Sequence, residues 1–98
     1  MQVAQGDLAG ALKSYRDGLV ISERLAQSDP GNADWRRDLA VSEAKIAATL
    51  RKIGNGDEAL ESLKRGQAIM AQLLALSPDN AGWKRDLDWF EAQIAELS

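Results

Sequence analysis

The sequence contains no cysteine and no histidine. Without cysteine, the chain can form neither a disulfide nor a thiolate zinc site. Without histidine, it lacks the usual general base of hydrolytic enzymes and the commonest metal ligand in proteins. The sequence also offers no glycine-rich phosphate loop after a strand and no constellation of paired carboxylates. We therefore expect a protein that is not an enzyme and that requires no metal and no cofactor.

An excess of positive charge is missing too, because 12 Lys and Arg residues stand against 15 Asp and Glu residues. Acidic residues interrupt the short basic runs, which argues against a nucleic-acid-binding face. No apolar run approaches the ~20 residues that cross a membrane. The first residues have neither the basic nor the apolar region of a signal peptide. We expect no nucleic-acid or membrane partner and a cytoplasmic location.

Proline is scarce, and its two occurrences, Pro30 and Pro78, lie 48 residues apart in a sequence that repeats at this interval. When residues 6–50 are placed on residues 54–98 without a gap, eighteen positions carry the same residue. The clearest match joins residues 30–39 (PGNADWRRDL) to residues 78–87 (PDNAGWKRDL). A fixed period of this size is typical of stacked units that bury their apolar faces against one another. The repeat predicts one domain over residues 1–98.

The spacing of the apolar residues is helical throughout, and no strand-like alternation persists. Residues suited to turns and caps divide the chain, and they predict helices at about 7–27, 32–53, 57–76 and 80–97. Asp7 and Asn32 are suited to cap helix N-termini, and Asp29 and Asp57, which flank turns, are also expected as caps. Gly54 suits the left-handed residue after a helix end. The connections are short, so neighbouring helices should run antiparallel.

Several short motifs resemble those of the tetratricopeptide repeat (TPR) family. The family pattern W-x2-L-G-x2-Y, A-x3-F, P has counterparts in residues 43–50 (EAKIAATL), 59–63 (ALESL) and 11–15 (ALKSY). The family's turn, G-D-x-x-x-A, is similar to residues 6–11 (GDLAGA) and 54–59 (GNGDEA). The period here is 48 residues instead of 34, an excess of about two heptads, one in each helix. The chain thus resembles a long-helix variant of the family.

The resemblance implies an all-α, TPR-like solenoid of antiparallel helix pairs that wind into a right-handed superhelix. In this frame, residues 6–31 hold the second helix of one repeat, residues 32–77 a full repeat, and residues 80–98 the first helix of the next. Such repeats are adaptors that bind peptide or protein segments in a concave groove. The implied function is a non-catalytic interaction module within a longer array; the alternative is a self-assembling helical bundle or spacer without a separate ligand.

The family's groove positions can be carried onto this chain. They fall on two predicted helices and give the candidate partner-binding residues Arg37, Val41, Ala44, Ala48, Arg51, Lys52, Arg85, Trp89, Ala92 and Glu96. Positions 37, 41, 44, 48 and 51 form one helical face by spacing alone. The side chains in the middle of this face are small, and those at both ends are cationic. Such a face is suited to bind an apolar segment that is flanked by acidic groups.

Individual residues on this face have competing interpretations. Arg37 and Arg85 either capture a ligand carboxylate, or Arg37 pairs with Asp34, or both arginines are solvated. Trp89 either anchors a partner, as aromatic residues on binding surfaces often do, or packs on the preceding helix. Tyr15 has no activating neighbour in the sequence and is expected in the core.

Other repeated residues favour structural roles. Trp35 and Trp83 begin their helices on the apolar stripe, so core packing is expected for both. Asp38 and Asp86 lack a third ligand for a metal and suit ionic support near a helix N-terminus.

The fourth predicted helix has no second helix of its own to cover it. We therefore expect partial exposure of its apolar residues, Trp83, Phe90, Ile94 and Leu97. Exposed apolar surface of this kind favours association. The isolated chain is expected to form a homodimer through its exposed helix ends, unless it belongs to a longer repeat array.

Overall fold

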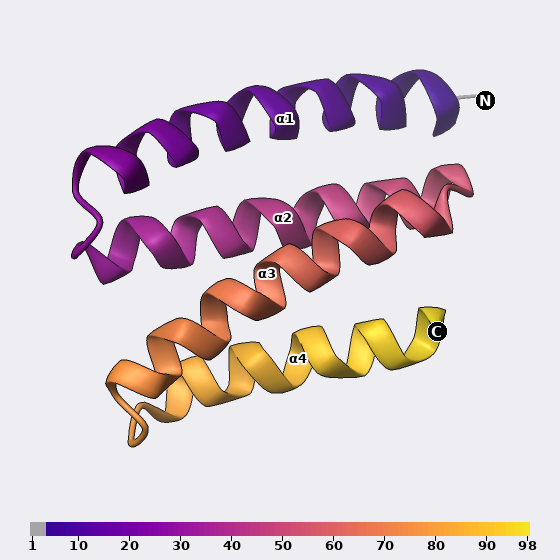
Figure 1. Cartoon of the computed structure of the whole chain (residues 1–98). Helices are drawn as coiled ribbons and strands as arrows, with labels where there is room; N and C mark the ends of the chain where they lie inside the picture. The colour runs from indigo at the N-terminus through magenta and orange to yellow at the C-terminus, as the bar shows by residue number, and fades with distance from the viewer. Residues whose placement is uncertain (1–3) are drawn as a thin grey trace.

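The computed structural model describes residues 4–98, which form four α-helices and no strand. The helices are α1 (Ala4–Ser28), α2 (Ala33–Ile53), α3 (Gly56–Leu76) and α4 (Ala81–Leu97). The chain reverses its direction at each connection, and each helix packs on the one before it (Figure 1). The predicted all-helical class is confirmed. Within residues 4–98, no helix combines the length and apolarity that a membrane crossing requires.

Asparagine side chains cap the N-termini of three of the helices. Asn32 Oδ1 accepts a hydrogen bond from the Trp35 amide at 3.1 Å, and Asn80 Oδ1 accepts one from the Trp83 amide at 3.0 Å. These bonds satisfy amides that lack a partner in the first helical turn, so the predicted cap at Asn32 is confirmed, and Asn80 caps α4 in the same way. Asn55 caps α3, whereas the expected cap Asp57 lies within the first turn of that helix. Gly54 ends α2 with φ of 98°, a left-handed conformation that side chains oppose, as predicted.

Asn80→Ala should lower the free energy of unfolding by about 1 kcal/mol, because the Trp83 amide loses its acceptor. Urea unfolding followed by circular dichroism measures the change. Asn80→Asp retains a side-chain acceptor at the cap and should stay close to wild type. Equal losses in both variants would show that the cap does not stabilise α4.

The start of α1 differs from the prediction. The helix begins at Ala4, so Gly6 lies inside it, and Asp7 lies in its first turn instead of capping it. Glycine in a helix costs only about 1 kcal/mol relative to alanine. Such a penalty does not stop a helix when the neighbouring residues favour it.

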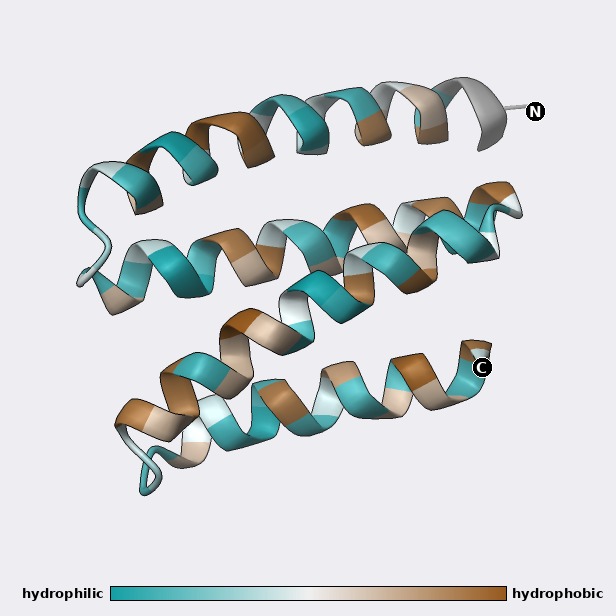
Figure 2. Cartoon of the chain, in the orientation of Figure 1, coloured by the Kyte–Doolittle hydropathy of each residue, from teal (hydrophilic) through white to brown (hydrophobic). Residues whose placement is uncertain are grey.

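The core lies between α2 and α3, with a contribution from α4. Its buried members are Ala40, Ile46, Ala47 and Leu50 of α2, Ala59, Leu63, Met70 and Leu73 of α3, and Phe90 of α4. Hydrophobic and hydrophilic stretches alternate along all four helices (Figure 2), as expected where one stripe of each helix is covered. Trp83 packs against this core and is partly buried, and Trp35 is partly buried as well.

Tyr15 was expected in the core, and this expectation is wrong. Its side chain is 36% exposed, and the Lys45 ammonium lies 5.9 Å from its ring centroid. Leu63, which stands 48 residues later in the repeat, is 1% exposed. The difference arises because α3 is packed between α2 and α4, whereas α1 contacts chiefly α2.

The expectation of partial exposure on α4 is wrong for Phe90 but holds for Trp83, Ile94 and Leu97. Phe90 is only 3% exposed, and Trp83, Ile94 and Leu97 are partly buried against the core. The exposed positions of α4 include charged side chains, among them Asp88 and Glu91. The packing of α4 on α3 therefore buries Phe90 and leaves the other three residues of the apolar stripe partly exposed.

Candidate functional site

Two adjacent pockets open between α2 and α4, and side chains of α3 form part of their lining. The first has a volume of about 160 Å³ and is lined by Ala40, Val41, Ala44, Met70, Asp86, Trp89 and Phe90. The second has a volume of about 240 Å³ and is lined by Ala47, Ala48, Arg51, Lys52, Leu63, Trp89 and Gln93. Trp89 is the residue common to both, so the two pockets form one groove on either side of its indole. We call this the α2–α4 groove.

The apolar walls of the α2–α4 groove follow from the size of its α2 residues. Alanines at positions 44, 47 and 48 leave space that larger side chains would fill. Leu63 and Met70 of α3, each 1% exposed, form the floor of the groove. The Trp89 ring meets the Phe90 ring edge to face with centroids 5.1 Å apart, yet Trp89 remains 43% exposed. An apolar surface with one exposed aromatic is thus available to a ligand.

Ionic contacts join α2 to α4 at both ends of the α2–α4 groove. Arg37 Nε donates to Asp86 Oδ2 at 2.8 Å. Arg51 donates to Gln93 Oε1 at 2.6 Å and to Glu96 Oε1 at 3.0 Å. The hydrogen bond to Asp86 raises the pKa of the Arg37 guanidinium, and the charge of that carboxylate adds to the effect while burial opposes it. Both guanidiniums are therefore already engaged.

The alternative in which Arg37 pairs with Asp34 is wrong. Arg37 pairs instead with Asp86, 49 residues away. Asp86 was expected to have a structural role, and the ion pair with Arg37 supplies one. The sequence did not indicate Arg37 as its partner. Lys52 differs from the two arginines, because no ion pair among residues 4–98 involves its exposed ammonium.

Six of the ten predicted partner-binding residues line the α2–α4 groove, namely Val41, Ala44, Ala48, Arg51, Lys52 and Trp89. Arg37 and Glu96 belong to the ionic contacts at its ends. Arg85 and Ala92 are exposed on α4 and line neither pocket.

The sequence analysis missed seven of the lining residues, which are Ala40, Ala47, Leu63, Met70, Asp86, Phe90 and Gln93. Gln93 and Asp86 lie one helical turn from Trp89, so helical spacing could have found them. Leu63 and Met70 of α3 could not have been found in this way, because an apolar residue on a helix is as consistent with core packing as with a pocket wall.

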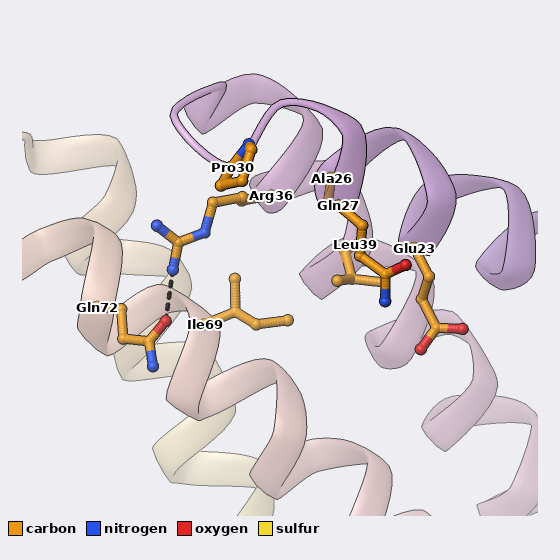
Figure 3. Close-up of a pocket in the computed structure, with 8 residues that line it drawn as sticks. All are labelled: Glu23, Ala26, Gln27, Pro30, Arg36, Leu39, Ile69 and Gln72. Carbon is orange, nitrogen blue, oxygen red and sulfur yellow. Dashed lines mark hydrogen bonds between the residues drawn. The ribbon is translucent and has the colours of Figure 1, made fainter.

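A larger pocket of about 520 Å³ lies where α1, α2 and α3 meet (Figure 3). It is lined by Glu23, Ala26, Gln27, Pro30, Arg36, Leu39, Ile69 and Gln72. Arg36 of α2 donates a hydrogen bond to Gln72 of α3 on one side of this space, and Ile69 lies beside that bond (Figure 3). None of these residues was predicted as a ligand contact. The mixed lining of charged, amide and aliphatic groups identifies no particular ligand.

Comparison with known proteins found no matching family model, no matching curated protein and no matching solved structure. The geometry and chemistry of the α2–α4 groove therefore carry the functional argument.

Proposed function

We propose that the chain is a non-catalytic, TPR-like solenoid module that binds an apolar peptide segment of another protein in the α2–α4 groove. One observation carries the proposal: the exposed indole of Trp89 stands between two pockets with largely small or apolar walls. Aromatic anchors of this kind dominate the energy of many protein interfaces. Two apolar side chains of a ligand would enter the pockets on either side of the indole.

The charged residues of the α2–α4 groove narrow the class of ligand that we propose. Arg37 and Arg51 are neutralised by Asp86 and Glu96, so a ligand carboxylate at either position would have to displace an existing partner. Lys52 lines the second pocket and is free to pair with a carboxylate. The proposed ligand has two apolar residues and one acidic residue near the Lys52 end. An exposed pair of this type contributes more to orientation and association rate than to affinity.

A peptide library displayed on phage and selected against the full chain tests the proposal. Trp89→Ala should weaken the selected peptides by about tenfold or more, because the two pockets lose their common wall. Arg85→Ala is the matched control, because this exposed α4 residue lines neither pocket. Fluorescence anisotropy gives the affinities, and circular dichroism shows whether the fold is retained.

Selected peptides that bind Trp89→Ala as well as wild type would contradict the proposal. Lys52→Glu adds a second check, because it should weaken only those peptides that carry an acidic residue. If acidic and neutral peptides lose affinity equally, the proposed orientation of the ligand is wrong.

Self-assembly without a separate ligand is the second candidate function. The exposure of Ile21 (59%) and Leu25 (40%) on α1 favours it, because exposed apolar side chains promote association. It predicts helix content and melting temperature that rise with protein concentration. Light scattering over about a hundredfold range of concentration measures the mass directly, and a constant monomer mass would exclude this candidate.

A further inference from the structure

Residues that line the α2–α4 groove recur at heptad spacing on both of its walls. On α2, they include Val41, Ala44, Ala48 and Arg51. On α4, they include Asp86, Trp89 and Gln93. The intervals between these residues alternate between three and four positions, as they do along the contact stripe of a coiled coil. Each wall therefore presents a stripe of the kind that packs against a further helix.

The two pockets of the groove are related by a shift of seven residues on all three helices. The equivalent lining residues are Val41 and Ala48 of α2, Met70 and Leu63 of α3, and Asp86 and Gln93 of α4. The shift has the opposite sign on α3, because α3 runs against α2 and α4 (Figure 1). Seven residues of a helix rise about 10.5 Å. The pockets therefore follow one another along the groove at about this distance.

The distance between the pockets favours a helical ligand. Two side chains seven positions apart on a helix point to the same side and are about 10.5 Å apart. In an extended strand, side chains on one side are about 7 or 13 Å apart, so neither spacing fits. A polyproline II segment has a suitable spacing of about 9 Å over three residues, but its backbone makes no internal hydrogen bonds. The aliphatic side chains of Val41, Ala44 and Ala48 offer no partners to such a backbone, whereas a helix satisfies its own.

Each pocket has room for one large apolar side chain. The volumes are about 160 Å³ for the first pocket and about 240 Å³ for the second. For comparison, an apolar cavity of about 150 Å³ can hold a benzene molecule. The exposed Trp89 indole lies between the pockets. A ligand helix with an apolar side chain in each pocket would cover the indole with the turns between them.

Lys52 is the charged residue of the groove that remains available to a ligand. The acids on the α4 side of the groove, Asp86 and Glu96, each accept a hydrogen bond from an arginine of α2. No ion pair among residues 4–98 involves Lys52, which lines the second pocket. A ligand helix therefore gains an ionic contact where it places an acidic residue beside the second pocket.

The position of Lys52 also indicates which way the ligand helix runs. Lys52 lies near the end of α2 at Ile53, and α4 ends at Leu97 on the same side of the molecule (Figure 1). The carboxyl end of a helix carries partial negative charge, and the amino end carries partial positive charge. The amino end of the ligand helix therefore suits this side, and an acidic residue near that end stabilises the ligand helix as well. In this direction, the ligand is antiparallel to α2 and α4, as α3 is.

We propose that the α2–α4 groove binds an amphipathic α-helix of a partner protein, an inference that rests on the function proposed above and specifies its ligand. The helix carries two large apolar residues seven positions apart and an acidic residue one turn before the first of them. Its first apolar residue enters the pocket lined by Lys52, and its second enters the pocket lined by Asp86. The bound helix completes a four-helix bundle with α2, α3 and α4, in which neighbouring helices are antiparallel.

Synthetic helices with different leucine spacings test the proposal. The probe is an alanine-based peptide with two leucines seven positions apart, a glutamate four positions before the first leucine, and an i, i+4 side-chain bridge on the opposite face. The matched control has the same composition and bridge, but its leucines are five positions apart and point about 140° away from each other. Fluorescence anisotropy with the full chain measures both affinities. We expect the seven-residue spacing to bind at least about tenfold more tightly, because only this peptide fills both pockets.

Ala48→Leu tests the direction of the helix, because Ala48 is exposed and lines the second pocket but not the first. The larger side chain should occupy that pocket, so replacement of the first peptide leucine by alanine should cost little further affinity in this variant. Replacement of the second leucine should still weaken binding by about tenfold. Ala92→Leu is the matched control, because exposed Ala92 on α4 lines neither pocket. The opposite dependence on the two leucines would mean that the helix runs the other way and would overturn the proposal.

The remaining outcomes separate this inference from the function on which it rests. Equal affinities for the two leucine spacings, or no binding of either peptide, would overturn the helical ligand. Phage-selected peptides whose binding depends on Trp89 would then still support the proposed function. Selected peptides that bind without Trp89 would contradict the proposed function itself.

Discussion

Leu73→Ala is expected to lower the free energy of unfolding by about 2–5 kcal/mol, the usual range for removal of a buried leucine. Leu73 is 0% exposed and belongs to the core between α2 and α3. The loss combines the transfer free energy of the deleted atoms with the cost of the cavity that remains. Since a small domain is stabilised by only about 5–15 kcal/mol, this single change should consume a large part of its stability. Urea unfolding followed by circular dichroism provides the measurement.

Leu25→Ala is the matched control, because Leu25 occupies the same position of the earlier repeat. Its side chain is 40% exposed, so the same deletion should cost less than about 1 kcal/mol. The two leucines thus compare one repeat position with and without a covering helix. Equal losses would mean that Leu25 is covered in solution, for example by a second molecule. The Leu25→Ala loss would then depend on protein concentration.

Gly66→Ala should destabilise the chain by about 1–3 kcal/mol, although alanine is the better helix former. A Cβ atom at Gly66 would lie 2.3 Å from Phe90 Cε1 and 2.5 Å from Phe90 Cζ. The Phe90 ring is 3% exposed and packs against Trp89, so it has little room to move aside. The melting temperature and the urea midpoint should both fall.

Gly18→Ala changes the glycine at the same position of the earlier repeat and should have the opposite sign. A Cβ atom there meets nothing within 4 Å, so the helix gains up to about 1 kcal/mol from the better propensity of alanine. Gly66→Ala combined with Phe90→Leu should lose less than the sum of the two single changes, because the smaller side chain makes room for the new methyl group. Strict additivity would show that the Gly66–Phe90 contact does not cause the loss.

These pairs show why repeat-related residues cannot be interpreted from sequence alone. Leu25 and Leu73 are the same residue at the same register, and so are Gly18 and Gly66. Their surroundings differ because α3 has a helix on each side, whereas the main contacts of α1 are with α2. Sequence identity sets the direction of each side chain on its helix but not what lies opposite.

The candidate site was only partly predictable for a related reason. Helical spacing and the resemblance placed Val41, Ala44 and Ala48 on one face, and the structure puts all three beside Trp89. The charges could not be assigned in this way. Arg37 has an acid three residues away in sequence, yet it bonds to Asp86 on another helix. The approach of α2 and α4 decides this contact, and no local pattern encodes it.

By itself, the sequence determined the helical class, the number of helices and most of their ends. These features depend on interactions between residues a few positions apart, such as the bond from the Trp35 amide to Asn32 and the left-handed turn at Gly54. Only the tertiary structure decided which stripe of each helix is covered, which charges are paired and where the groove opens. Those outcomes depend on side chains that are tens of residues apart in the chain and meet only when the helices pack.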